Sequence, residues 1–163
     1  MTENKINNEA VKSYFTKLQT DIINAVEIVD GKNFLVDSWQ RSEGGGGTTC
    51  ILENGNIFER AGIGFSHVVG SQLPKSATDA HPEITDSKWE ATGVSLVFHP
   101  KNPFIPTVHM NVRFFVAKKN NKYVWWFGGG MDLTPYYGFD EDAIHFHKTI
   151  QAGLNPFGKD LYP

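Results

Sequence analysis

Residues 92–127 have the sequence TGVSLVFHPKNPFIPTVHMNVRFFVAKKNNKYVWWF, which decides the expected fold. Three runs rich in β-branched and aromatic residues, Thr92–His99, Thr107–Lys118 and Lys122–Phe127, are separated by a proline-containing link and by a polar turn at Lys119–Asn121. Such runs with short polar connections predict consecutive antiparallel strands. We therefore expect a three-stranded meander here.

The residues before this meander predict one helix and further short strands. Apolar residues recur at helical spacing from Asn8 to Val29, and Gly31 follows as a stop. The polar stretch Ser71–Ser87 contains two prolines and predicts a long surface loop. Strands are expected at Phe34–Gln40, Thr48–Leu52, Asn56–Glu59 and Gly62–Val69, with turns at Arg41–Gly47 and Asn54–Gly55.

The residues after the meander predict a glycine-rich loop and a second helix. Gly128–Gly130 would allow the backbone to approach a ligand closely and would present Asp132 from the loop. Asp132 could instead accept a hydrogen bond from Thr134 or cap a turn. A helix is expected at Asp140–Ala152, with acidic residues at its positive end and a glycine after it. The pattern predicts one α+β domain over residues 1–163 with a predominantly antiparallel sheet.

Bulk properties narrow the classes of protein that fit. The net charge of −3 gives no electrostatic support for nucleic-acid binding. Cys50 is the single cysteine, so the chain has no internal disulfide and a cytoplasmic location is expected. No run approaches the roughly 20 apolar residues of a membrane span, and the N-terminus lacks a signal-peptide pattern. The aromatic share of 13% favours a pocket or sheet face that binds a flat, apolar ligand; packing of these residues in the core is the alternative.

The strongest candidate site lies on the middle strand of the meander. Side chains alternate in a strand, so His109, Asn111 and Arg113 share one face and the intervening apolar residues share the other. Together they offer a proton carrier, an amide and a bidentate clamp for a carboxylate. A partly buried structural network is the alternative.

Two further histidines are candidates. His99 ends the preceding strand on the same face as Ser95, and pairing of the two strands would bring it near His109 for metal binding or proton transfer; a surface histidine is the alternative. On the second helix, His147 lies on the apolar stripe and is expected to face the core, whereas His145 lies on the polar side. A satisfied core histidine is the alternative for His147.

The order and spacing of five motifs resemble the oxygen-dependent coproporphyrinogen III oxidase family, from about Val36 to Pro163. The motifs are Glu43–Gly47, Phe58–Gly62, Gly93–Pro100, His109–Phe115 and Trp125–Pro135. The resemblance implies oxidative decarboxylation of two propionates of coproporphyrinogen III to vinyls, which gives protoporphyrinogen IX in haem biosynthesis. It implies molecular oxygen as co-substrate and no organic cofactor, since an electron-rich porphyrinogen could pass electrons to oxygen itself. It also implies a large antiparallel sheet flanked by helices.

The resemblance also implies roles for individual residues. His109 matches the proton donor, and Asp132 matches an aspartate that faces the pyrrole nitrogens. Substrate contacts are implied for Ser95, Asn111, Val112 and Arg113, and we group His109, Asp132 and Arg113 as catalytic. Divalent metal ligands in some bacterial members match His99, His109 and His147.

The chain departs from the family pattern in two residues and in length. Cys50 stands where family members commonly have Arg, and Gly64 where many have Asn. Family chains continue beyond the segment that matches Leu161–Pro163, so we expect a C-terminal part, much of the homodimer contact and some of the sheet to be absent here. Two rival functions stay open: a truncated, non-catalytic tetrapyrrole-binding module, and a non-haem iron oxygenase with a two-His-one-carboxylate set drawn from the histidines and aspartate above.

Overall fold

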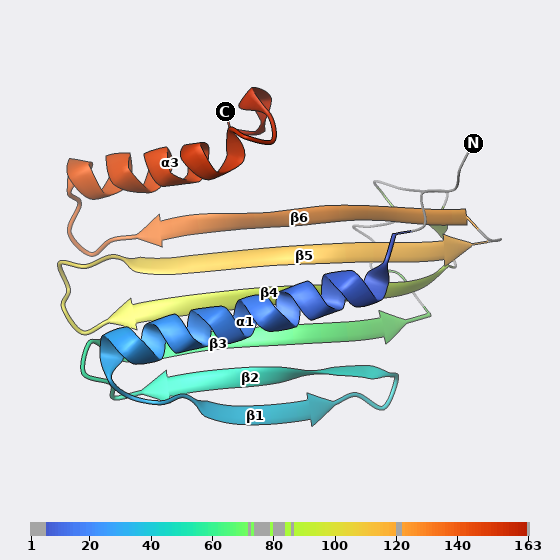
Figure 1. Cartoon of the computed structure of the whole chain (residues 1–163), viewed down its shortest axis with the longest axis horizontal. Coiled ribbons are helices and arrows are strands. Elements are labelled where there is room, and N and C mark those ends of the chain that lie inside the picture. Colours follow the sequence, from blue (N-terminus) through green and yellow to red (C-terminus); the bar gives the residue numbers. More distant parts are fainter. Residues whose placement is uncertain are drawn as a thin grey trace.

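The computed structural model describes residues 6–71, 73, 79, 84–85, 87–119 and 122–162. Six strands form one sheet in the order β1-β2-β3-β4-β5-β6, and each is antiparallel to its neighbours. Helix α1 lies across one face of the sheet, and helix α3 lies beyond the edge strand β6 (Figure 1). The predicted α+β class with an antiparallel sheet is confirmed.

The order of helices and strands along the chain is close to the predicted one. They are α1 (Asn8–Asp30), β1 (Leu35–Gln40), β2 (Gly45–Glu53), β3 (Phe58–Gly70), β4 (Lys88–Pro100), β5 (Thr107–Lys119), β6 (Lys122–Thr134), α3 (Asp140–Leu154) and the short 3-10 helix η2 (Lys159–Leu161). The meander is confirmed, and β4 begins earlier than predicted. Most of the expected loop Ser71–Ser87 and the turn residues 120–121 lie outside the described residues.

Glycine-rich segments that we predicted as turns or loops lie partly in strands. Gly45–Gly47 begin β2, and Gly128–Gly130 lie within β6, where each pairs with a residue of β5. The two short strands expected at 56–69 are one strand, β3, with an irregularity between Phe58 and Arg60. These loop predictions are wrong because pairing with neighbouring strands outweighs the low strand propensity of glycine.

The core lies between α1 and one face of the sheet. Phe15 and Val26 of α1 are buried against alternate residues of the strands. The amide of Gln19 is buried with them and donates to the carbonyl oxygens of Thr48 (2.9 Å) and Ile63 (3.0 Å). The strand residues of this core are Cys50, Leu52, Ala61, Ile63, Phe65, Val94, Leu96, Phe114 and Val116. The opposite face of the sheet, which we call the open face, carries the residues between them.

Helix α3 is in the predicted place, but it does not bury an apolar face. Acidic residues occupy its first turn as expected, and it continues past Gly153 to Leu154. None of its residues is buried, and Ile144 on the apolar stripe is 51% exposed. The apolar stripe of α3 therefore has nothing to pack against among the described residues.

A buried carboxylate joins the end of α1 to the turn between β2 and β3. Asp30 is only 3% exposed and accepts backbone N–H bonds from Asn56, Ile57 and Phe58, each at 2.9 Å. Burial acts to raise the pKa of Asp30, but the three backbone donors, together with the charge of Lys101, hold that pKa below its usual value of 3.8. The ionised carboxylate is therefore the form that stabilises this junction.

We expect Asp30→Asn to lower the free energy of unfolding by about 1–3 kcal/mol at neutral pH, because an amide cannot accept all three backbone bonds. The folded-state pKa lies below 3.8, so the contribution of the carboxylate is complete above that pH and is lost as the pH falls through the folded-state value. Urea unfolding at a series of pH values measures both effects. Asp21→Asn, at an exposed ion pair on α1, is the matched control. Equal stability of Asp30→Asn and wild type at pH 7 would contradict the assignment.

Candidate functional site

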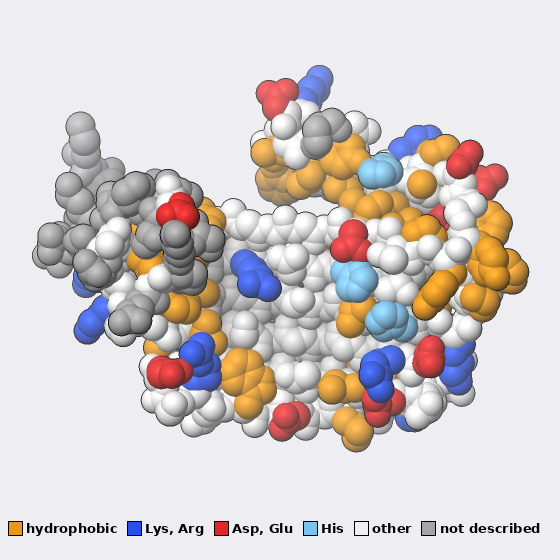
Figure 2. All heavy atoms as spheres, turned by 180° about the vertical axis from the view of Figure 1, so that it is seen from behind, with side chains coloured by type: hydrophobic (Ala, Val, Ile, Leu, Met, Phe, Trp, Pro, Cys, Tyr) orange, Lys and Arg blue, Asp and Glu red, His pale blue; other side chains and the backbone are white. Residues whose placement is uncertain are grey.

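The open face carries the predicted polar residues in three rows that cross the strands. Cross-strand partners point to the same face, so the register of β3 to β6 defines the rows. They are Gly62, Val97, His109 and Asp132; Gly64, Ser95, Asn111 and Gly130; and Ser66, Gly93, Arg113 and Gly128. Figure 2 shows this face as a broad area of backbone and uncharged side chains with a basic side chain within it and histidine side chains gathered to one side.

A hollow of about 630 Å³ lies over the first two rows. It brings together Ser95, His109, Asn111 and Asp132, as the sequence predicts for one site. A smaller hollow of about 220 Å³ adjoins it and shares Ser95, and Arg113 lines this second space. The side chain of Val112 lies on the other face and packs against the core, so a side-chain contact from Val112 to a ligand on the open face does not fit the structure.

The closest contact among the candidate residues joins His109 to Asp132. His109 Nδ1 lies 2.7 Å from Asp132 Oδ1, and Thr134 Oγ1 donates to the same oxygen at 3.2 Å. An ionised carboxylate only accepts, so in this pair the hydrogen is on Nδ1 and Nε2 is the nitrogen available for proton exchange. Both side chains are accessible, His109 at 45% and Asp132 at 62%.

The structure corrects the setting of Asp132 and confirms one predicted bond. Asp132 lies in strand β6, opposite His109 in the ladder, and not in a glycine-rich loop. The predicted hydrogen bond from Thr134 is present. Within the described residues, Asp132 Oδ2 has no hydrogen-bond partner, which leaves this oxygen open toward the hollow.

His99 lies beside His109, as the pairing of β4 and β5 predicted. The two ring centroids are 6.3 Å apart in an edge-to-face arrangement. His99 Nδ1 is 3.3 Å from the hydroxyl of Thr107, which fixes the orientation of its ring. His99 of β4, His109 of β5 and Asp132 of β6 thus lie side by side at this end of the open face.

His147 is not buried, and the prediction that it faces the core is wrong. It is exposed on α3, and its Nδ1 bonds to the hydroxyl of Tyr162. The reason is that α3 lies beyond the sheet edge and does not pack on either face. Among the described residues, no group of three or more His, Cys, Asp or Glu side chains is placed to hold a metal ion. Neither the three-histidine set nor the two-His-one-carboxylate set is assembled in this arrangement, and metal binding stays a prediction.

Cys50 and Gly64, the two expected departures from the family pattern, lie on different faces of the sheet. Cys50 is buried beneath α1, where burial and then the charge of Glu27 raise the pKa of its thiol. Gly64 lies on the open face and lines both hollows. Gly62 and Gly64 line the larger hollow, although neither was predicted as a site residue. Their alternation with the apolar residues Ala61 and Ile63 was the signal that could have placed them there.

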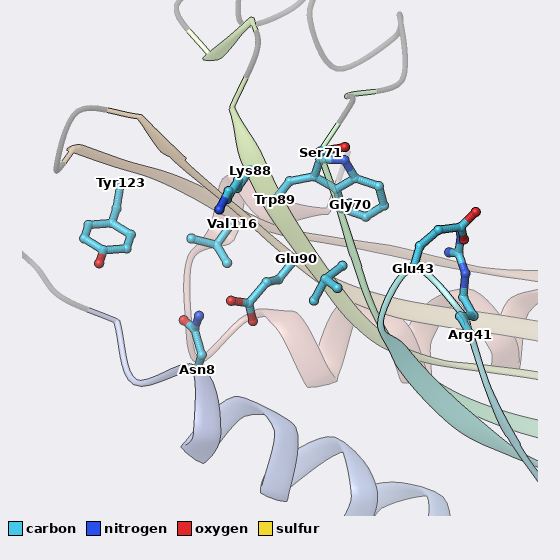
Figure 3. Close-up of a pocket in the computed structure, with 11 residues that line it drawn as sticks. Asn8, Arg41, Glu43, Gly70, Ser71, Lys88, Trp89, Glu90, Val116 and Tyr123 are labelled. Atoms are coloured by element: carbon cyan, nitrogen blue, oxygen red, sulfur yellow. The ribbon is translucent and has the colours of Figure 1, made fainter.

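A separate hollow of about 560 Å³ lies at the other end of the molecule, near the start of α1. Figure 3 shows Glu90 and Val116 pointing toward Asn8 on one side of it, and Arg41 beside Glu43 on the other. Arg41 and Glu43 form an ion pair at 2.7 Å. None of the predicted site residues lines this hollow, so it is not the candidate site.

No helix in the described part of the chain has the length and apolar character that a membrane span requires.

A comparison with known protein families matches most of the chain. The family model described as Coproporphyrinogen III oxidase matches residues 10–163. This match includes most of α1, all six strands and every residue that lines the 630 Å³ hollow. The chain therefore belongs to the coproporphyrinogen III oxidase family.

Proposed function

We propose that this protein converts two propionate side chains of coproporphyrinogen III to vinyls, with molecular oxygen as the electron acceptor. For each side chain, R–CH2–CH2–COO⁻ loses CO2, a proton and two electrons to become R–CH=CH2. Molecular oxygen takes up the two electrons and two protons and becomes H2O2. The porphyrinogen is electron-rich, so the proposal needs no flavin or nicotinamide.

The observation that carries this proposal is the placement of an acid–base pair and a guanidinium on one face of a rigid sheet. His109 and Arg113 are four residues apart on β5, which corresponds to about 13 Å along a strand. The macrocycle of coproporphyrinogen III is broad and carries carboxylates at its rim. Its nitrogens can therefore lie near Asp132 while one propionate reaches Arg113.

Arg113 is suited to hold a propionate carboxylate. Its side chain is exposed on the open face, and within the described residues it makes no ion pair. A guanidinium binds a carboxylate through two parallel hydrogen bonds, which fixes both position and orientation. We assign Arg113 to that contact, with Asn111 and Ser95 lining the space between it and the acid–base pair.

His109 and Asp132 are suited to move and hold protons. Asp132 Oδ1 fixes the tautomer of His109, so Nε2 can supply a proton that the reduction of oxygen consumes. Asp132 Oδ2 can accept a hydrogen bond from a pyrrole N–H. Metal binding by His99, His109 and His147 stays a separate prediction, and the proton steps above are assigned to the side chains alone.

A non-catalytic tetrapyrrole-binding module is one alternative, since the same face could hold the ring without reaction. Incubation of the protein with coproporphyrinogen III under air separates the two possibilities. Vinyl-containing products support the enzyme, whereas tetrapyrrole binding without product supports the binding module. We further propose a cytoplasmic location, on the basis of family membership and the single buried cysteine, and a homodimer for the full-length protein, on the basis of family membership.

We expect Asp132→Ala to reduce kcat by about two orders of magnitude or more, because it removes the group that orients His109. Asp132→Asn should be similarly impaired, since it keeps the shape but removes the charge. The measurement is the initial rate of protoporphyrinogen IX formation at saturating substrate. Asp21→Ala, at an exposed carboxylate on α1 and away from the open face, is the control. Near-normal vinyl product from Asp132→Ala would refute the role of Asp132.

We expect Arg113→Ala to raise KM by about 10- to 150-fold, because a charged hydrogen bond contributes about 1.5–3 kcal/mol. Arg113→Lys should fall between the wild type and Arg113→Ala, since lysine keeps the charge but loses the two-pronged geometry. Steady-state kinetics across a range of substrate concentrations measures the change. Arg41→Ala is the control, because Arg41 pairs with Glu43 far from this hollow. An unchanged KM in Arg113→Ala would place the propionate elsewhere.

A further inference from the structure

Three adjacent glycines in β6 have different steric surroundings. A Cβ atom on Gly129 would come within 2.5 Å of the carbonyl oxygen of Asn111, so a larger residue there would force the backbone to move. A Cβ atom on Gly128 or on Gly130 would meet nothing within 4 Å. The strand therefore requires glycine at the middle position and not at the two positions beside it.

Backbone conformation does not require glycine at Gly128 or Gly130 either. Positive φ angles among the described glycines occur at Gly31, Gly44 and Gly45, and both β6 residues lie in ordinary extended strand. Glycine inside a strand weakens it, because it loses more conformational freedom on folding and offers no side chain to pack. At these two positions the fold therefore gains nothing from the absence of a side chain.

Both glycines face the proposed site. Gly130 pairs with Asn111 and lines the 630 Å³ hollow, and Gly128 pairs with Arg113. On the same face of the strand, the next side chain after Gly130 is that of Asp132. The bare segment of β6 thus lies between the carboxylate proposed for the pyrrole nitrogens and the guanidinium proposed for a propionate.

We infer that Gly130 and Gly128 are specificity-determining residues that let one broad side of a tetrapyrrole macrocycle lie against the sheet between Asp132 and Arg113. This inference rests on the proposed function and adds to it the orientation of the ligand, with the ring plane parallel to the sheet. A methyl group at either position would hold the ring away from the neighbouring atoms. A gap of 0.5–1 Å already forfeits about a quarter to a half of each dispersion contact, and a ring makes many such contacts.

The test is a titration of the protein with coproporphyrin III, the stable oxidised ring, followed by its absorbance and fluorescence. The variants are Gly130→Ala, Gly128→Ala and Gly130→Val. Gly138→Ala is the matched control, because a Cβ atom there also meets nothing within 4 Å and Gly138 lies outside the hollow. The Tm of each variant measures its stability separately from binding. Gly129→Ala serves as the comparison in which the added Cβ atom clashes with the backbone.

We expect Gly130→Ala and Gly128→Ala to keep or raise Tm and to weaken porphyrin binding on the order of tenfold, since many dispersion contacts are lost at once. Gly130→Val should weaken binding further, whereas Gly138→Ala should bind as the wild type does and Gly129→Ala should lower Tm. Wild-type affinity in both alanine variants would overturn the inference and leave the proposed function intact. If the wild-type protein binds no porphyrin, the inference fails, and formation of vinyl products from coproporphyrinogen III decides the proposed function separately.

Discussion

The burial of α1 against one face of the sheet is the constraint on which the rest of the structure depends. Side chains alternate along a strand, so a slip of one residue would move Ala61 and Ile63 from the core into solvent. Gln19 reinforces the alignment, because its buried amide donates to one carbonyl of β2 and one of β3. These two hydrogen bonds fix the position of α1 relative to Thr48 and Ile63, in addition to the apolar contacts that α1 makes with the sheet.

The candidate site follows from this register. His109 and Asp132 lie 23 residues apart in the chain, and they meet because β5 and β6 pair in the register that puts Met110 and Val112 on the core side. Within the described part of the chain no helix covers the open face, so its polar groups are accessible, and α1 packs on the opposite face of the strands that hold them (Figure 1). A rigid ladder keeps such groups in place better than a loop would, which suits chemistry that depends on orientation.

Much of this arrangement could be predicted from alternation and helical spacing alone. The meander, α1, and the convergence of His99 on His109 follow from local patterns because each reflects burial of one face. The glycines of β6 were misassigned to a loop, because their strand state depends on pairing with β5 and not on their own propensity. The apolar stripe of α3 predicted a buried His147, but a stripe shows only that a helix can pack and does not show that a partner is present.

The alternation of side chains along β2 and β3 also places Cys50 and Gly64, the two expected departures from the family pattern, on opposite faces of the sheet. Cys50 pairs with Ile63, and the next position along each strand pairs Thr49 with Gly64. One departure therefore falls in the core and the other on the open face. Buried beside Gln19, the Cys50 thiol has a raised pKa, so it stays neutral and acts as a small packing group. Gly64 instead leaves space: a Cβ atom there would have no neighbour closer than the Ser95 carbonyl oxygen at 3.9 Å. Of the two expected departures, Cys50 therefore affects packing in the core and Gly64 affects the shape of the hollow.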